Sequence, residues 1–198
     1  MENIIFVIIL ILSVVIHELA HGYAADAMGD PTPRLSGRLT LNPIAHLDWI
    51  GSVVIPGLLI MTGAPFVIGW AKPVPFNPYY LNNKKWGGAL VAFAGPVSNI
   101  LLAGIFALVL KLAVFSGFIT AFFTGIVIVN IALAIFNLVP IPPLDGHHIL
   151  YALLPERFSY IKDLFRKYSI IILILFIMYG WQFISPIIMG TAEFLLSW

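Results

Sequence analysis

Three chemically active side chains lie close together in the apolar stretch VVIHELAHG, namely His17, Glu18 and His21. Histidines four residues apart project from the same face of a helix, about one turn apart. Two imidazoles at this spacing can bind one zinc ion. Glu18 lies about 100° around the helix from His17 and about 60° from His21, which suits a general base better than a ligand. This HExxH pattern predicts a zinc-dependent hydrolytic site.

The alternative is that the same three residues line a polar crevice or hydrogen-bond a neighbouring helix. An ionisable side chain at membrane depth costs about 2.5 kcal/mol or more, so three of them need compensation. A divalent cation supplies that compensation, whereas packing alone does not. We therefore favour the metal site.

A catalytic zinc ion usually has three protein ligands and one open position. The chain contains no cysteine, so the third ligand must be a histidine or a carboxylate. Asp145, in NLVPIPPLDGHH, is the only acidic residue between Asp48 and Glu156, and it is our candidate. A helix-stop turn is the alternative role for Asp145. The neighbouring His147 and His148 are weaker candidates because they lie closer to a basic loop.

The composition is that of a membrane protein. Of 198 residues, 61% are hydrophobic and only 10% are charged, and the mean hydropathy is +1.02. Soluble domains carry about 25% charged residues. The net charge of +1 without a clustered basic face argues against nucleic-acid binding.

Five apolar segments are near the ~20 residues needed to cross hydrocarbon. They cover residues 4–25, 50–68, 88–114, 117–139 and 169–190. The second contains prolines and glycines that break helices, so we expect a re-entrant or irregular element there. The fold prediction is an all-α polytopic membrane protein with four to five transmembrane helices. Residues 1–198 are expected to form one membrane domain.

Two stretches have strand-like character, residues 36–42 and 72–78. They predict a short membrane-associated β-hairpin or sheet, and they are candidates for holding an unwound substrate strand. The basic residues lie mainly in loops that can share one side of the membrane if residues 50–68 enter and return. By the positive-inside rule that side is cytoplasmic, both termini are outside, and the site lies near the cytoplasmic face.

Two further polar residues have less specific surroundings. Asn99 lies in an apolar segment, where either an interhelical hydrogen bond or a catalytic role is expected. His46 is expected to be interfacial.

The combination of HExxH with a distant NLVPIPPLDG resembles the site-2 protease family of intramembrane metalloproteases. FAGPVSN, at residues 93–99, matches a third recurring feature of that family. The resemblance implies that His17, His21 and Asp145 bind one zinc ion and that Glu18 is the base. It also implies that Asn137 positions the substrate or stabilises the oxyanion. The chain is similar to the compact subgroup without PDZ or CBS domains, although His147 stands where a second glycine is frequent.

The predicted function is an intramembrane zinc endopeptidase that cleaves a transmembrane helix of a membrane-anchored substrate by metal-activated water. Its expected partners are that substrate helix and the lipid bilayer. No feature of the sequence specifies one substrate or an oligomeric state. The alternative is a transporter of metal ions or protons, since buried His, Asp and Glu also mark ion pathways.

Overall fold

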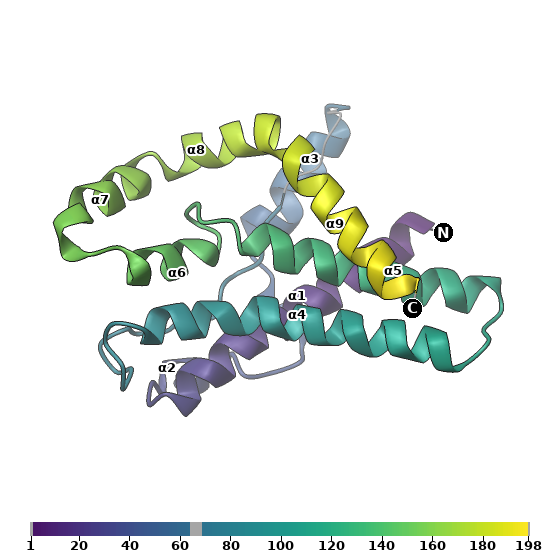
Figure 1. Ribbon diagram of the computed structural model, residues 1–198, viewed down its shortest axis with the longest axis horizontal. Coiled ribbons are helices and arrows are strands. Elements are labelled where there is room, and N and C mark those ends of the chain that lie inside the picture. Colours follow the sequence, from purple (N-terminus) through teal and green to yellow (C-terminus); the bar gives the residue numbers. More distant parts are fainter. Residues whose placement is uncertain (1, 64–68, 198) are drawn as a thin grey trace.

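The computed structural model describes residues 2–63 and 69–197, which are mostly helical (Figure 1). The α-helices are α1 (Glu2–Ala27), α2 (Thr32–Leu35), α3 (Ile55–Met61), α4 (Gly87–Leu112), α5 (Gly117–Asn137), α6 (Gly146–Leu153), α7 (Ser159–Lys167), α8 (Ser169–Leu175) and α9 (Trp181–Leu196). Short 3₁₀ turns lie at Pro43–His46 and Glu156–Phe158, and π-helical turns at Trp49–Val54 and Phe176–Gly180.

Within the described parts of the chain, four helical segments are long and apolar enough to cross a membrane. They are Ile4–Ala27, Gly87–Leu112, Gly117–Asn137 and Ser169–Leu196. They coincide with four of the five apolar segments predicted from the sequence, and the last continues beyond its predicted end. The chain is thus a multi-pass membrane protein by length and composition of its helices.

Helix α4 packs against both α1 and α5. Its small residues Ala103 and Ala107 are 0% and 7% exposed, and they allow Val127 and Ile131 of α5 to approach closely. Ile188 of α9 joins the same cluster. This packing fixes α1, α4 and α5 relative to one another, and these three helices carry the buried polar residues described below.

The helix ends are distributed so that one end of the bundle carries most of the irregular structure. Figure 1 shows α2, α6 and α7 toward one end, and the α4–α5 connection and both chain termini toward the other. The C-terminal ends of α1 and α5 lie toward the first end. Residues near these two ends can therefore meet.

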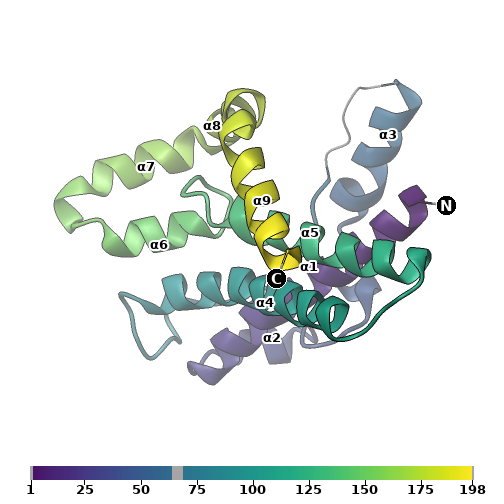
Figure 2. The same ribbon diagram turned by 45° about the vertical axis from the view of Figure 1, so that its right-hand side comes forward.

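The predicted irregular segment at 50–68 leaves the bundle and returns. It begins with a π-helical turn and continues as α3, which stands apart from the other helices in Figure 2. Its two ends are adjacent, because the Trp70 N–H donates to the Gly51 carbonyl at 3.1 Å and the Ser52 hydroxyl donates to the Trp70 carbonyl at 2.8 Å. Residues 64–68 of the predicted segment lie outside the described residues.

The expected β-hairpin is not found among the described residues. Its nearest equivalent is one antiparallel bridge between Leu47 and Ala71, next to a hydrogen bond from the Lys72 N–H to the His46 carbonyl at 2.8 Å. Residues 72–78 contain prolines at 73, 75 and 78, which have no N–H to continue a ladder. The segment is therefore held by single contacts rather than by a strand partner.

One of these contacts comes from Asp30, which is fully buried just after α1. Its carboxylate accepts hydrogen bonds from the Thr32 N–H at 3.0 Å, the Thr32 hydroxyl at 2.5 Å and the Asn77 N–H at 2.5 Å. Burial acts to raise the pKa of Asp30, but these bonds outweigh burial and hold the pKa below its usual value. Asp30 thereby ties the segment 72–78 to the end of α1.

We expect Asp30→Asn to lower the free energy of unfolding by about 1–3 kcal/mol. The substitution replaces one buried carboxylate oxygen with an NH₂ group, which cannot accept a hydrogen bond from the Thr32 or Asn77 donors that face it. Thermal or denaturant unfolding of the purified protein in detergent measures this. Since the folded pKa is lowered, the stabilisation is present above about pH 4 and is lost as the pH falls.

Asp26→Asn is the matched control. Asp26 pairs with Arg34 at 2.5 Å, but the Arg34 side chain is 69% exposed, so we expect a loss of at most about 1 kcal/mol. Equal losses in the two variants would contradict the anchoring role of Asp30.

Candidate metal centre

The two histidines of HELAH lie on one face of α1, as their spacing predicts. His17 and His21 are 6% and 8% exposed. Their ring centroids are 4.6 Å apart, and their Nε2 atoms are separated by 3.0 Å. Two imidazole nitrogens thus point to the same place inside the bundle.

Asp145 brings a carboxylate to the same place from the connection between α5 and α6, directly before the first residue of α6. Its Oδ2 atom lies 3.0 Å from His17 Nε2 and 3.3 Å from His21 Nε2. The approach requires Gly146, because a Cβ at that position would collide with the backbone carbonyl of Leu138. The prediction that Asp145 lies beside the histidine pair is therefore met in the structure.

The hydrogen bonds of the two rings determine which nitrogen carries the proton. His17 Nδ1 lies 2.6 Å from the side-chain oxygen of Asn99, and His21 Nδ1 lies 2.8 Å from the Val91 carbonyl. Both partners are acceptors, so each Nδ1 must donate a proton. Each neutral ring then has a lone pair on Nε2, the form that binds a metal ion.

The three converging atoms fit a cation. Asp145 Oδ2 is buried and has no hydrogen-bond partner. Ligands bound at about 2.0–2.1 Å to a tetrahedral zinc ion lie about 3.3 Å apart, close to the observed separations. The donor set and spacing therefore suit zinc.

Both imidazoles lie against Gly95 of α4. A Cβ at this position would come within 2.5 Å of His21 Cε1 and 2.6 Å of His17 Cε1. Only a hydrogen fits between α4 and the rings. The FAGPVSN motif thus contributes the space that the histidines occupy, as well as Asn99.

Glu18 lies beside the cluster and is half-buried. Its Oε2 atom accepts a hydrogen bond from the Val74 N–H at 2.8 Å. Val74 stands between Pro73 and Pro75, which have no N–H, so it supplies the single backbone donor of this tripeptide. The extended segment 72–78 is therefore in direct contact with the candidate base.

The other candidates lie outside the three-residue cluster. Asn137, at the end of α5, donates from its side-chain amide to the Leu133 carbonyl at 3.0 Å. His147 Nδ1 bonds the Leu144 carbonyl at 2.6 Å. His148 packs against Phe76, and burial, followed by repulsion from His147, lowers the pKa of His148 to about 4.

His46, which the sequence predicts to be interfacial, is buried within the protein. It is 2% exposed, and its Nε2–H donates to the Thr40 carbonyl at 2.9 Å, because a carbonyl only accepts. It helps to fold the connection between α2 and the π-helical turn. Its backbone carbonyl also holds Lys72.

Two functional candidates were not singled out from the sequence, Ser13 and Asn130. Their side chains, together with that of Asn99, form a fully buried hydrogen-bonded chain behind His17. Polar residues in otherwise apolar spans were the available signal, since such residues are rare at membrane depth. Asn99 makes the interhelical hydrogen bond that was one of its two expected roles.

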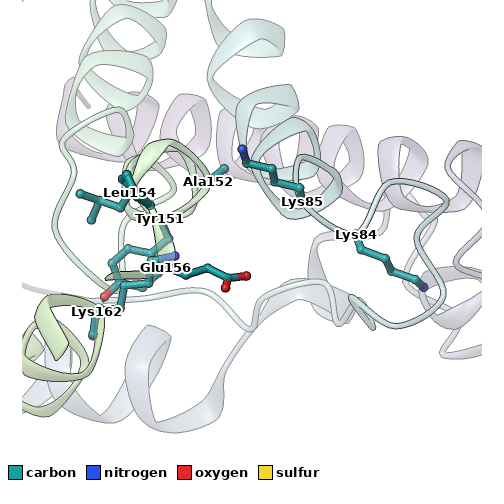
Figure 3. Close-up of a pocket in the computed structure, with 8 residues that line it drawn as sticks. Lys84, Lys85, Tyr151, Ala152, Leu154, Glu156 and Lys162 are labelled. Carbon is teal, nitrogen blue, oxygen red and sulfur yellow. Dashed lines mark hydrogen bonds between the residues drawn. The ribbon is translucent and has the colours of Figure 1, made fainter. Parts of the chain in front are cut away.

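A pocket of about 450 Å³ lies away from this cluster, at the end of α6. It is lined by Lys84, Lys85, Tyr151, Ala152, Leu154, Pro155, Glu156 and Lys162 (Figure 3). None of the converging ligand atoms borders it. In Figure 3 the Lys84 side chain points away from the other residues, consistent with its hydrogen bond to the Tyr79 carbonyl.

Comparisons with known proteins agree with this chemistry. Residues 5–120 and 111–180 match the model of peptidase family M50. YwhC of Bacillus subtilis (strain 168), named a zinc metalloprotease, is 45% identical over 158 residues, which cover 75% of this chain and 68% of YwhC.

Two more distant relatives carry the same kind of name. Rip2 of Mycolicibacterium smegmatis, named a zinc metalloprotease, is 30% identical over 71% of this chain and 53% of Rip2. Rip2 of Mycobacterium tuberculosis (strain H37Rv) is 27% identical over 87% of this chain and 68% of that protein. No solved structure matches the chain significantly. The chain belongs to peptidase family M50, the zinc-dependent site-2 proteases, and it is a zinc metalloprotease rather than a transporter.

Proposed function

We propose that this M50 peptidase cleaves its substrates within or at the end of their transmembrane helices. The observation that carries the proposal is the position of the ligand cluster inside a membrane-spanning helix. His17 and His21 precede the end of the span at Ala27 by about 15 and 9 Å of helix rise. A scissile bond that reaches His17 and His21 must therefore enter the helix bundle at a depth within the membrane-spanning part of α1.

In this proposal His17, His21 and Asp145 hold one zinc ion. When bound, zinc supplies a Lewis acid that polarises the scissile carbonyl and lowers the pKa of water toward ~7. The 19% exposure of the Asp145 side chain gives the cluster a route to water. The remaining steps are proton transfers and contacts made by the chain itself.

Glu18 is the proposed general base. It accepts the proton of the attacking water and returns it to the leaving amine. The Val74 N–H holds one carboxylate oxygen of Glu18 at 2.8 Å, which orients the carboxylate and leaves its second oxygen for the proton. Val74 is thus a positioning residue in the proposed mechanism.

Asn137 is the proposed oxyanion donor. A side-chain amide carries two N–H groups, and one bond to the Leu133 carbonyl leaves the second available. A single well-placed donor of this kind is worth about 10²–10³ in kcat in other hydrolases.

The substrate helix must unwind before cleavage, because its carbonyls are otherwise occupied by i→i−4 hydrogen bonds. The extended segment 72–78 contacts Glu18 and is a candidate to hold the unwound strand. Its prolines offer carbonyl acceptors but no N–H donors. A bound strand would therefore donate to it rather than form a full ladder.

The proposed orientation places the cluster near the cytoplasmic face. Nine of the ten lysines and arginines, all but Lys111, follow α1 or α5 or precede α4 or α8. Short loops rich in lysine and arginine remain cytoplasmic. The excursion at residues 49–70 is then re-entrant, since its two ends meet on this same side.

Glu18→Gln should retain zinc but lower the cleavage rate by about 10²–10⁴-fold, because the amide cannot accept the proton. Purified protein is incubated in detergent with a reporter containing one transmembrane helix, and zinc is measured by mass spectrometry. Glu193→Gln, an exposed glutamate on α9, is the control and should cleave at the normal rate. Normal cleavage by Glu18→Gln would contradict the assigned base.

Removing the metal with a zinc chelator should abolish cleavage of the same reporter. Adding zinc should restore cleavage, whereas Mg²⁺ should not, because Mg²⁺ prefers an octahedral shell of oxygen ligands to two imidazoles. Undiminished cleavage by protein shown to contain no zinc would refute the proposed chemistry.

Gly95→Ala should displace both imidazoles and sharply reduce the zinc content of the purified protein. Gly104→Ala on the same helix is the matched control, because a Cβ there meets no atom within 4 Å. Replacement of a helical glycine by alanine at such a site is neutral or stabilising by up to about 1 kcal/mol. Equal zinc contents in Gly95→Ala and Gly104→Ala would contradict the claim that the His17 and His21 imidazoles bind zinc from their positions against Gly95.

A further inference from the structure

Three buried side chains from three helices form a hydrogen-bonded chain that ends at His17. Ser13 of α1 is 2% exposed, and Asn99 of α4 and Asn130 of α5 are both 0% exposed. Neither Ser13 nor Asn130 belongs to the HExxH, LDG or FAGPVSN motifs. Burying two side-chain amides this completely is costly unless every polar atom is paired.

The donor-to-acceptor direction of these hydrogen bonds is set by the backbone carbonyl of Ile126. Asn130 Nδ2 lies 2.8 Å from the Ile126 carbonyl and 2.9 Å from the Ser13 hydroxyl oxygen. A carbonyl only accepts, so the NH₂ group of Asn130 must face it and its Oδ1 must face the other way. That Oδ1 lies 2.7 Å from Asn99 Nδ2.

The direction then passes to the histidine. With its NH₂ group facing Asn130, Asn99 presents Oδ1 to His17 Nδ1 at 2.6 Å. A longer contact of 3.5 Å from Asn99 Nδ2 to the Ser13 carbonyl has the same sense. Each bond in the chain therefore requires the next.

A reversed Asn99 amide would have a chemical consequence. Its NH₂ group would face His17 Nδ1, which would then have to accept, and the ring proton would move to Nε2. A protonated Nε2 has no lone pair for a metal ion. The orientation of one amide thus decides whether His17 can act as a ligand.

We propose that Asn130 is a positioning residue that fixes the amide of Asn99 and, through it, the metal-binding tautomer of His17. The inference rests on the proposed role of His17 as a zinc ligand and extends it to a residue on a third helix. Loss of such an outer partner of a ligating histidine typically weakens metal binding 10–100-fold.

The test uses Asn130→Leu, which is close in size but cannot orient Asn99. Zinc affinity is measured by competition with a chromophoric chelator, and the His17 tautomer by ¹⁵N NMR of the metal-free, histidine-labelled full chain in micelles. We expect a 10–100-fold weaker affinity and a new population of His17 protonated at Nε2. Asn130→Ala replaces Asn130→Leu if the latter does not fold.

Two further variants separate orientation from packing. Asn130→Asp still presents an oxygen to Asn99 Nδ2, so both the tautomer and most of the affinity should be retained. Ile131→Val removes a methylene from a buried neighbour that is 2% exposed, so it should lower the thermal midpoint without changing either readout. An unchanged tautomer in Asn130→Leu, or equal losses of affinity in Asn130→Leu and Ile131→Val, would overturn the proposal.

His17→Gln distinguishes this proposal from the one on which it rests. If His17→Gln binds zinc as tightly as the wild type, the proposed ligand set is wrong. If His17→Gln loses zinc while Asn130→Leu keeps both the affinity and the tautomer, the ligand set stands and the positioning role of Asn130 is wrong.

Discussion

The central constraint on this molecule is electrostatic. His17 Nε2, His21 Nε2 and Asp145 Oδ2 face one another at separations of 3.0–3.3 Å, mostly shielded from water. Both Nδ1 protons are already donated to fixed oxygens. Three acceptors in contact repel one another unless a cation lies among them, and their spacing suits a tetrahedral zinc ion.

Much of the fold serves to hold these acceptors together. Helix α1 supplies both imidazoles, and α4 supplies the space beside Gly95 and two of the oxygens that fix the rings. The connection between α5 and α6 brings in Asp145 through a turn that requires Gly146. Packing of α4 against α1 and α5 through small residues is therefore a condition for the chemistry as well as for stability.

The sequence predicted those features that depend on local spacing. The apolar spans follow from runs of about 20 residues, and the common face of His17 and His21 follows from the helical period. The convergence of Asp145 was expected from its residue type, its following glycine and the resemblance to site-2 proteases. These signals lie within short stretches of the chain.

Features that depend on docking between distant segments were not accessible in the same way. The bond between His17 and Asn99 spans 82 positions, and the bond between Asn130 and Ser13 spans 117. The expected hairpin is not formed because the prolines around Val74 remove ladder donors, while Glu18 and Asp30 accept from the N–H groups of Val74 and Asn77. Strand-like composition indicated an extended backbone there but did not identify its partners.

X-ray absorption at the zinc edge of the purified protein tests the metal centre most directly. Two imidazole nitrogens and one carboxylate oxygen should bind zinc at about 2.0–2.2 Å, with one position left for water. Exchange of Asp145 for alanine should remove the carboxylate contribution and leave both imidazoles. A spectrum with fewer than two imidazoles, or one unchanged by that substitution, would contradict a zinc ion held by His17, His21 and Asp145.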